Sequence, residues 1–71
     1  MTAFPERLQR LRESRRPVLS RRVTSELMGL STNALQKYER GERVPSAEAL
    51  VMIADYYDVS VDFLLGRMND R

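Results

Sequence analysis

The sequence predicts an all-α fold, a compact five-helix orthogonal bundle, and three observations favour it. Apolar residues recur three and four positions apart in several segments, which is the spacing that places side chains on one face of a helix. Serine precedes these segments and glycine follows them, as is typical of helix starts and ends. The joints between segments are short, and no alternating stretch is long enough for a strand, so neighbouring helices should stay in contact.

The first helix is predicted over residues 4–15, where an apolar stripe recurs at helical spacing. The stripe consists of Phe4, Leu8 and Leu11. Pro17 ends the helix, because the residue before a proline is driven away from the α region. Residues 18 and 19 are apolar and are expected to turn back toward the core.

Two further helices are predicted over residues 21–28 and 32–40, with a tight turn between them. Ser20 and Ser31 can cap them, since a serine hydroxyl accepts hydrogen bonds from the unpaired amides of a first turn. Gly29 ends the first of the two because glycine adopts positive φ without steric cost. The residues expected to be buried here are Leu30, Ala34, Leu35 and Tyr38.

The last two helices are predicted over residues 47–57 and 61–65. Their expected caps are Ser46 and Ser60. The apolar stripe of the longer helix consists of Ala47, Leu50, Ile53, Ala54 and Tyr57. The connection at residues 42–45 is polar, and Val44 is its one side chain expected to be buried.

The composition is typical of a single globular domain over residues 1–71, with a core at about 4–66 and a short tail at 67–71. The chain has no cysteine and no histidine, which removes disulfides, thiolate and imidazole metal ligands, and histidine general bases. We therefore expect no metal, no cofactor and no enzymatic activity. No apolar run approaches the roughly 18 residues of a membrane span and no signal peptide opens the chain, so a cytoplasmic location is expected.

The modest net charge of +2 conceals an asymmetry along the chain. Residues 1–45 hold ten Lys or Arg against five Asp or Glu, whereas residues 46–71 hold two against five. A basic front and an acidic back suit a protein that meets a polyanion on one side. The alternative is that the arginines solvate helix surfaces, which is what we expect of Arg7, Arg10, Arg15 and Arg16.

One face of the helix predicted over residues 32–40 is polar. It carries Thr32, Asn33, Gln36, Lys37 and Arg40. Asparagine and glutamine can bond adenine in bidentate fashion, lysine can reach guanine acceptors, and a helix fits the width of a DNA major groove. The face therefore suits base edges and phosphates, and the alternative is an ordinary solvated helix surface.

The stretch from Phe4 to Gly66 resembles the helix-turn-helix domains of the phage repressor and Cro class, the XRE family, whose fold is lambda repressor-like. The motifs that carry the resemblance are Leu19-Ser20 before the second helix, Gly29-Leu30-Ser31 at the turn, YERGER at residues 38–43 with Pro45-Ser46 after it, and VSVDFLLG at residues 59–66. A helix-turn-helix pattern alone is a weak signal, but together with these motifs at the family spacing it is a strong one.

The resemblance implies that the third helix lies in a DNA major groove. The base-reading residues would be Thr32, Asn33, Gln36 and Lys37. The expected phosphate contacts are Arg21, Arg22, Ser31, Arg40 and Arg43. Glu39 would form a structural salt bridge with Arg12.

Three features depart from the family pattern. The joint at residues 16–19 is longer than the usual tight connection, and Thr24 and Ser25 stand where leucine and alanine are common. Ser25 is small enough to preserve the close approach of the helices. Thr24 must form a hydrogen bond inward or face solvent.

These observations predict a sequence-specific binder of double-stranded DNA that regulates transcription, with repression as the expected outcome. We expect a homodimer on a palindromic operator, with half-sites about 34–36 Å apart. The alternative is an antitoxin or other partner-binding module whose DNA binding is autoregulatory and whose acidic C-terminal face holds a protein. Part of the acidic half could instead form a dimer face, for which the candidate residues are Tyr56, Met68 and the exposed parts of Val61 and Leu64.

Overall fold

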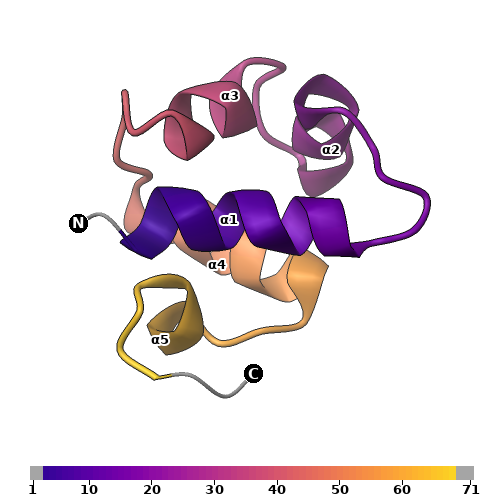
Figure 1. Cartoon of the computed structure of the whole chain (residues 1–71). Coiled ribbons are helices and arrows are strands. Elements are labelled where there is room, and N and C mark those ends of the chain that lie inside the picture. The colour runs from indigo at the N-terminus through magenta and orange to yellow at the C-terminus, as the bar shows by residue number, and fades with distance from the viewer. Residues whose placement is uncertain (1–2, 69–71) are drawn as a thin grey trace.

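A computed structural model describes residues 3–68, and the predicted all-α, five-helix fold is confirmed (Figure 1). The helices are α1 (Ala3–Ser14), α2 (Arg21–Met28), α3 (Ala34–Glu39), α4 (Ala47–Tyr57) and α5 (Val61–Leu64). Residues 69–71 of the predicted tail lie outside the described residues. Among residues 3–68, none of the helices has both the length and the apolar character to cross a membrane.

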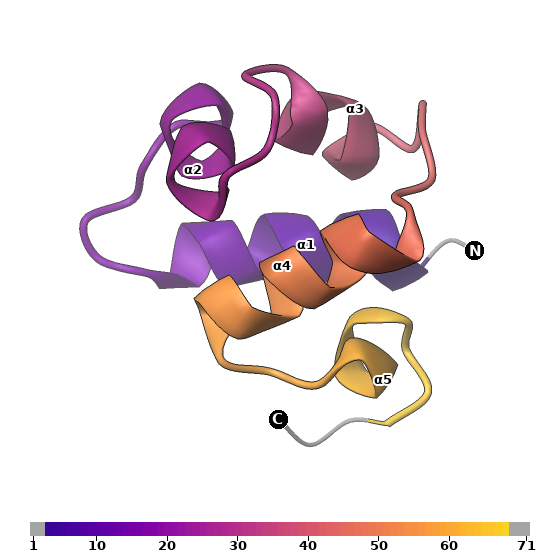
Figure 2. The same cartoon turned by 180° about the vertical axis from the view of Figure 1, so that it is seen from behind.

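Helices α1 and α4 lie at the centre of the bundle, with the pair α2 and α3 on one side and α5 on the other (Figures 1 and 2). The core between them receives buried side chains from all five helices. Its members are Phe4, Leu8, Leu11, Met28, Ala34, Leu35, Tyr38, Ile53, Ala54, Tyr57 and Leu64. Helices this short are marginal by themselves, so this shared core is what holds α3 in place.

Three helices begin at the predicted serine caps. The hydroxyl of Ser20 accepts from the Val23 amide at 3.1 Å, and the hydroxyls of Ser46 and Ser60 cap α4 and α5 in the same way. Gly29 ends α2 with a φ of 85°, as its position predicts. Each such cap stabilises its helix by about 1 kcal/mol.

Two burial predictions in the connections are wrong, those for Val18 and Val44, whereas Leu30 packs against the core as expected. Val44 is 86% exposed, and Pro45 beside it is the buried residue of this connection. Val18 is 48% exposed, while Leu19 and Leu30 are half-buried. Connections lack a helical period, so the sequence does not show which of their apolar residues turns inward.

Two predictions for the C-terminal half also need correction. Ala47 is exposed, because it is the first residue of α4 and precedes the part of the helix that meets the core. Leu64, a candidate residue of the dimer face, has no exposed surface and belongs to the core. Tyr56 and Met68 are 40% and 43% exposed, so they remain available on that face.

Candidate nucleic-acid interface

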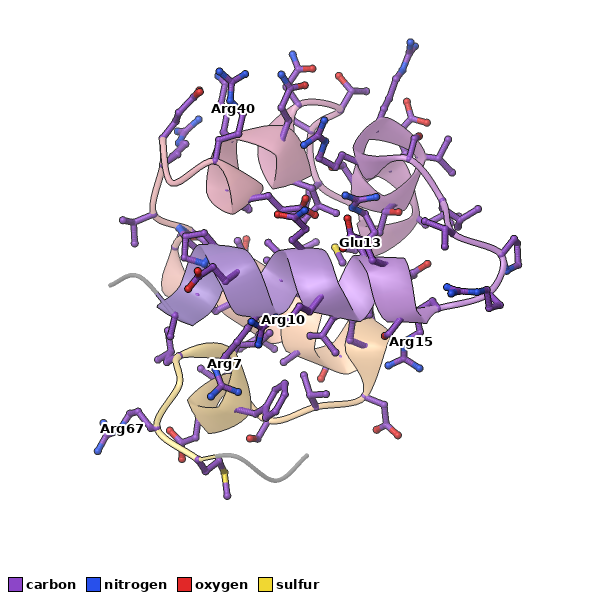
Figure 3. The ribbon with its side chains drawn as sticks, in the orientation of Figure 1. Arg7, Arg10, Glu13, Arg15, Arg40 and Arg67 are labelled. Carbon is purple, nitrogen blue, oxygen red and sulfur yellow. The ribbon has the colours of Figure 1, made fainter. Side chains whose placement is uncertain are left out.

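The pair α2 and α3 forms one edge of the molecule, with a turn between the two helices (Figure 1). Four of the six residues of α3 face inward: Ala34, Leu35, Tyr38 and Glu39. The polar side chains predicted for the opposite face are exposed, namely Thr32, Asn33, Gln36, Lys37 and Arg40. Arg40 points away from α1 at this edge (Figure 3). The structure therefore brings the predicted base-reading residues together on one accessible surface.

Helix α3 is shorter than the helix predicted over residues 32–40, since it spans Ala34–Glu39. Thr32 and Asn33 lie in the turn that precedes it. Ser31 is not its cap: the Ser31 backbone carbonyl accepts from the Ala34 amide at 3.0 Å. The residue at the cap position is Asn33, whose side chain forms no capping hydrogen bond. The predicted N-cap at Ser31 is therefore wrong.

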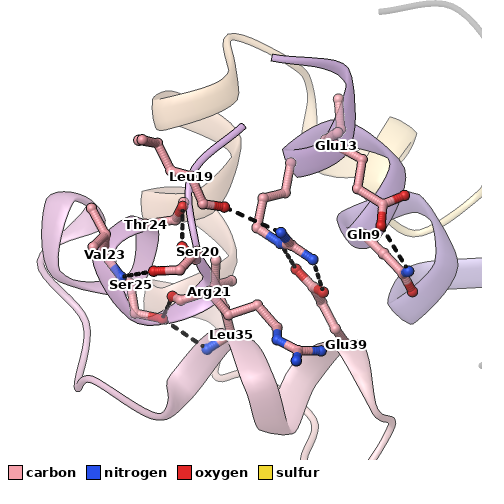
Figure 4. Close-up of polar contacts among 12 residues, drawn as sticks. Gln9, Glu13, Leu19, Ser20, Arg21, Val23, Thr24, Ser25, Leu35 and Glu39 are labelled. Carbon is pink, nitrogen blue, oxygen red and sulfur yellow. Dashed lines mark hydrogen bonds and ion pairs between the residues drawn. The ribbon is translucent and has the colours of Figure 1, made fainter. Parts of the chain in front are cut away.

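The missing cap comes from α2. The hydroxyl of Ser25 donates to the Arg21 carbonyl at 2.7 Å and accepts from the Leu35 amide at 3.0 Å (Figure 4). Ser25 has no exposed surface. The small size of Ser25 was evident from the sequence, but this contact was not. The signal for it was a hydroxyl at a position where close helix packing favours alanine.

Thr24, which also departs from the family pattern, is buried rather than exposed to solvent. Its side chain is 2% exposed, and its hydroxyl donates to the Ser20 carbonyl at 2.8 Å. This bond satisfies the hydroxyl within its own helix, so Thr24 occupies the core side of α2 without an unpaired polar group.

Arg12 and Glu39 form the expected pair. The Nε and Nη2 atoms of Arg12 donate to the two carboxylate oxygens of Glu39 at 2.9 and 3.1 Å, and Nη1 donates to the Leu19 carbonyl at 3.1 Å (Figure 4). The hydrogen bond to Glu39 raises the pKa of Arg12, against the opposing effect of burial. This one guanidinium thus joins α1 to the end of α3 and to the joint before α2.

The residues predicted to contact phosphates are all exposed: Arg21, Arg22, Ser31, Arg40 and Arg43. Arg22 lies 3.9 Å from Glu26, and Arg40 lies 2.9 Å from Glu42. Such exposed ion pairs contribute only about 0–1 kcal/mol, so these arginines can turn to a phosphate at little cost. Within residues 3–68, Arg21 and Arg43 form no ion pair.

Three arginines in α1 or directly after it do not join this surface. Arg7, Arg10 and Arg15 lie on the side of α1 away from Arg40 (Figure 3). Arg7 is half-buried, rather than solvated as predicted, and its guanidinium lies 4.8 Å from the centre of the Phe63 ring. Arg15 is exposed but donates to the Tyr57 carbonyl at 2.6 Å. The basic N-terminal half is therefore divided between two sides of the molecule.

Among residues 3–68, no group of three or more acidic, histidine or cysteine side chains is placed to hold a metal ion. Two short helices joined by a glycine-ended turn, the second with an exposed polar face, define a helix-turn-helix domain. The chain belongs to the helix-turn-helix domain family, whose model matches residues 3–64, and the predicted resemblance to XRE-type regulators is confirmed.

The curated relatives are regulators of transcription by name. The HTH-type transcriptional regulator AnsR of Bacillus subtilis is 42% identical over 66 residues, which cover 93% of this chain and 55% of AnsR. The cryptic phage CTXphi transcriptional repressor RstR of Vibrio cholerae is 48% identical over 40 residues, 56% of this chain and 36% of RstR. The regulator ImmR of Bacillus subtilis is 33% identical over 60 residues, 83% of this chain and 47% of ImmR.

The chain spans about half the length of the curated relatives it matches. No solved structure gives a significant match to it.

Proposed function

We propose that this domain binds a specific double-stranded DNA site with α3 in the major groove. One observation carries the proposal: α3 buries one face against the core and presents Gln36 and Lys37 on the other, with Thr32 and Asn33 exposed at its start. In helix-turn-helix complexes the N-terminal residues of the second helix contact base edges, which is where these side chains lie. Membership of the helix-turn-helix family and the names of the relatives support the same function.

The spacing of Asn33 and Lys37 suits base pairs about two steps apart in a duplex. Asn33 and Lys37 are four residues apart, which is on the order of 6 Å along a helix at 1.5 Å per residue. Base pairs are about 3.4 Å apart, so the two side chains would address positions about two base pairs apart. Asn33 would favour adenine and Lys37 guanine, and Gln36 and Thr32 would contact bases beside them.

The arginines around α3 would set its position on the duplex. Helix α2 begins with Arg21 and Arg22, and α3 is followed by Arg40 and Arg43. In the sequence, these four arginines therefore lie on both sides of the proposed base-reading residues. Ser31, exposed in the turn, offers a hydroxyl to a further phosphate. Contacts of this kind fix the register of a protein on DNA without reading its sequence.

The biological role that fits best is transcriptional repression. Occupancy of an operator would block polymerase, and a homodimer would match a palindrome with half-sites about 34–36 Å apart. RstR is named a repressor, in keeping with this role. We place the protein in the cytoplasm and assign it no catalytic role. The partner-binding antitoxin has less support, because the relatives are named as regulators of transcription.

The test is selection of duplexes from a random pool, followed by fluorescence-anisotropy titration against the selected and a scrambled duplex at several salt concentrations. The proposal predicts a preference for the selected duplex and a loss of about 0.9 log units of affinity per log unit of salt for each phosphate contact. Equal binding of the two duplexes, or no binding, would refute it.

A further inference from the structure

The start of α3 differs from the starts of its neighbours. Helices α2, α4 and α5 each begin with a serine whose hydroxyl accepts from the amide three residues later. Asn33, at the start of α3, makes no such bond, and its backbone angles of −102° and 6° are outside the extended region that capping serines adopt here. The amides of the first turn of α3 must therefore find partners elsewhere.

Ser25 supplies one of these partners from α2. Its single hydroxyl proton is used toward the Arg21 carbonyl at 2.7 Å, so a lone pair is directed at the Leu35 amide, 3.0 Å away. The residue has no exposed surface, and therefore water cannot replace either bond. The Ser25 hydroxyl thus donates one hydrogen bond and accepts one, and the first bond fixes the direction of the second.

This bond constrains α3 in a way that apolar packing does not. Ala34 and Leu35 bury α3 against the core, but apolar contact has no preferred direction and tolerates small shifts of a short helix. A hydrogen bond weakens steeply when its angle departs from linear. The Ser25 hydroxyl therefore fixes the first turn of α3 relative to α2 through the buried Leu35, whose chain neighbourhood carries the exposed Asn33 and Gln36.

We propose that Ser25 is a positioning residue for DNA recognition, which holds the start of α3 at the angle where its exposed side chains meet base edges. The inference rests on the proposed DNA-binding function. Recognition sites need their contacting groups within about 0.5 Å and 10–20° of the productive geometry. Loss of the bond should therefore reduce discrimination between sequences more than it reduces general affinity for DNA.

The experiment compares Ser25→Ala with Ser60→Ala, which removes a similar cap from α5, outside the proposed interface. Each variant and the wild type are titrated against the selected and the scrambled duplex. Ser25→Ala should lower the ratio of the two affinities by roughly tenfold, the scale of one lost base contact, while its binding to the scrambled duplex is unchanged. Ser60→Ala should keep the wild-type ratio despite its own loss of melting temperature.

Amide hydrogen exchange at Leu35 provides a readout that needs no DNA. In Ser25→Ala this amide should exchange faster than in the wild type, and in Ser60→Ala it should not change beyond the change in global stability. Ser25→Cys gives the same test if the alanine variant fails to fold, because a thiol is a weak acceptor.

Three results would overturn the inference. An unchanged Leu35 exchange rate would show that the hydroxyl does not hold α3. An unchanged affinity ratio with faster exchange would reduce Ser25 to a stabilising role. If the wild type prefers no duplex, the proposed DNA-binding function fails, and faster exchange in Ser25→Ala would then report a purely structural link.

Discussion

Arg12 and Glu39, which stand 27 residues apart in the chain, form a two-point salt bridge in which the Glu39 side chain is only 1% exposed. A buried carboxylate depends on its partner, since removal of one member strands the other charge. The pair also lies where α1, α3 and the joint before α2 meet, because Arg12 bonds the Leu19 carbonyl as well. The salt bridge therefore holds the C-terminal end of α3 against α1, on the side opposite the exposed polar face of α3.

Loss of this carboxylate should destabilise the fold. Glu39→Ala leaves the Arg12 guanidinium partly buried without its counter-charge, and we expect it to reduce the free energy of unfolding by about 3–5 kcal/mol. Urea or thermal unfolding monitored by circular dichroism measures the change. Glu42→Ala is the matched control, because its pair with Arg40 is exposed and contributes about 0–1 kcal/mol. Equal losses in the two variants would contradict the structural role.

Two variants of the exposed surface around α3 should distinguish residues that read bases from residues that contact phosphates. Asn33→Ala should reduce the preference for the selected duplex by about 1–3 kcal/mol, because it would remove the bidentate contact to a base that we propose for Asn33. Arg40→Ala should weaken all sequences alike and lower the salt slope by about 0.9. Anisotropy titrations at several salt concentrations distinguish them. If Asn33→Ala weakened both duplexes equally, Asn33 would not read a base.

The hydroxyl of Tyr57 offers a test of the core. Burial raises the pKa of Tyr57 from its ordinary value of 10.0 to about 12, so the folded state keeps the phenol proton at a pH where the unfolded chain releases it. Stability from this group is therefore complete below pH 10 and falls as the pH rises toward 12, by up to about 2–3 kcal/mol.

Tyr57→Phe should remove part of this alkaline loss. Within residues 3–68 the Tyr57 hydroxyl is buried and has no hydrogen-bond partner, so we expect unchanged or higher stability at pH 7. Urea unfolding at pH 7, 10 and 11 measures both effects. The control is Tyr56→Phe, whose side chain is 40% exposed, and which should leave the alkaline loss as it is. A less stable Tyr57→Phe at pH 7 would show that the hydroxyl has a partner.

The helices could be predicted from the sequence where their signals are local. Ser20, Ser46 and Ser60 cap helices that begin one residue later, and Gly29 ends α2 as predicted. The start of α3 could not be predicted in this way, because its cap is a residue ten positions upstream on another helix. Val44 was expected to be buried and is exposed, because a connection outside a helix has no period to indicate its inner side.

Parts of the candidate site could likewise be predicted from the sequence, and other parts could not. The exposed face of α3 follows from helical spacing, so its residues could be named before the structure was known. The partnership of Arg12 with Glu39 came from the family resemblance, because no local pattern joins residues so far apart. The division of the basic residues between two sides of the molecule depends on how α1 packs, which the order of residues does not show.

The most direct test of the proposed DNA interface is an NMR titration of the ¹⁵N-labelled domain with the selected duplex, because it identifies the residues whose surroundings change on binding. We predict that the largest amide shifts fall at residues 21–22 and 31–43, which carry the proposed base and phosphate contacts, with small shifts in α5. If the largest shifts instead fell in α4 and α5, the proposed interface would be contradicted, since the duplex would then bind away from α3.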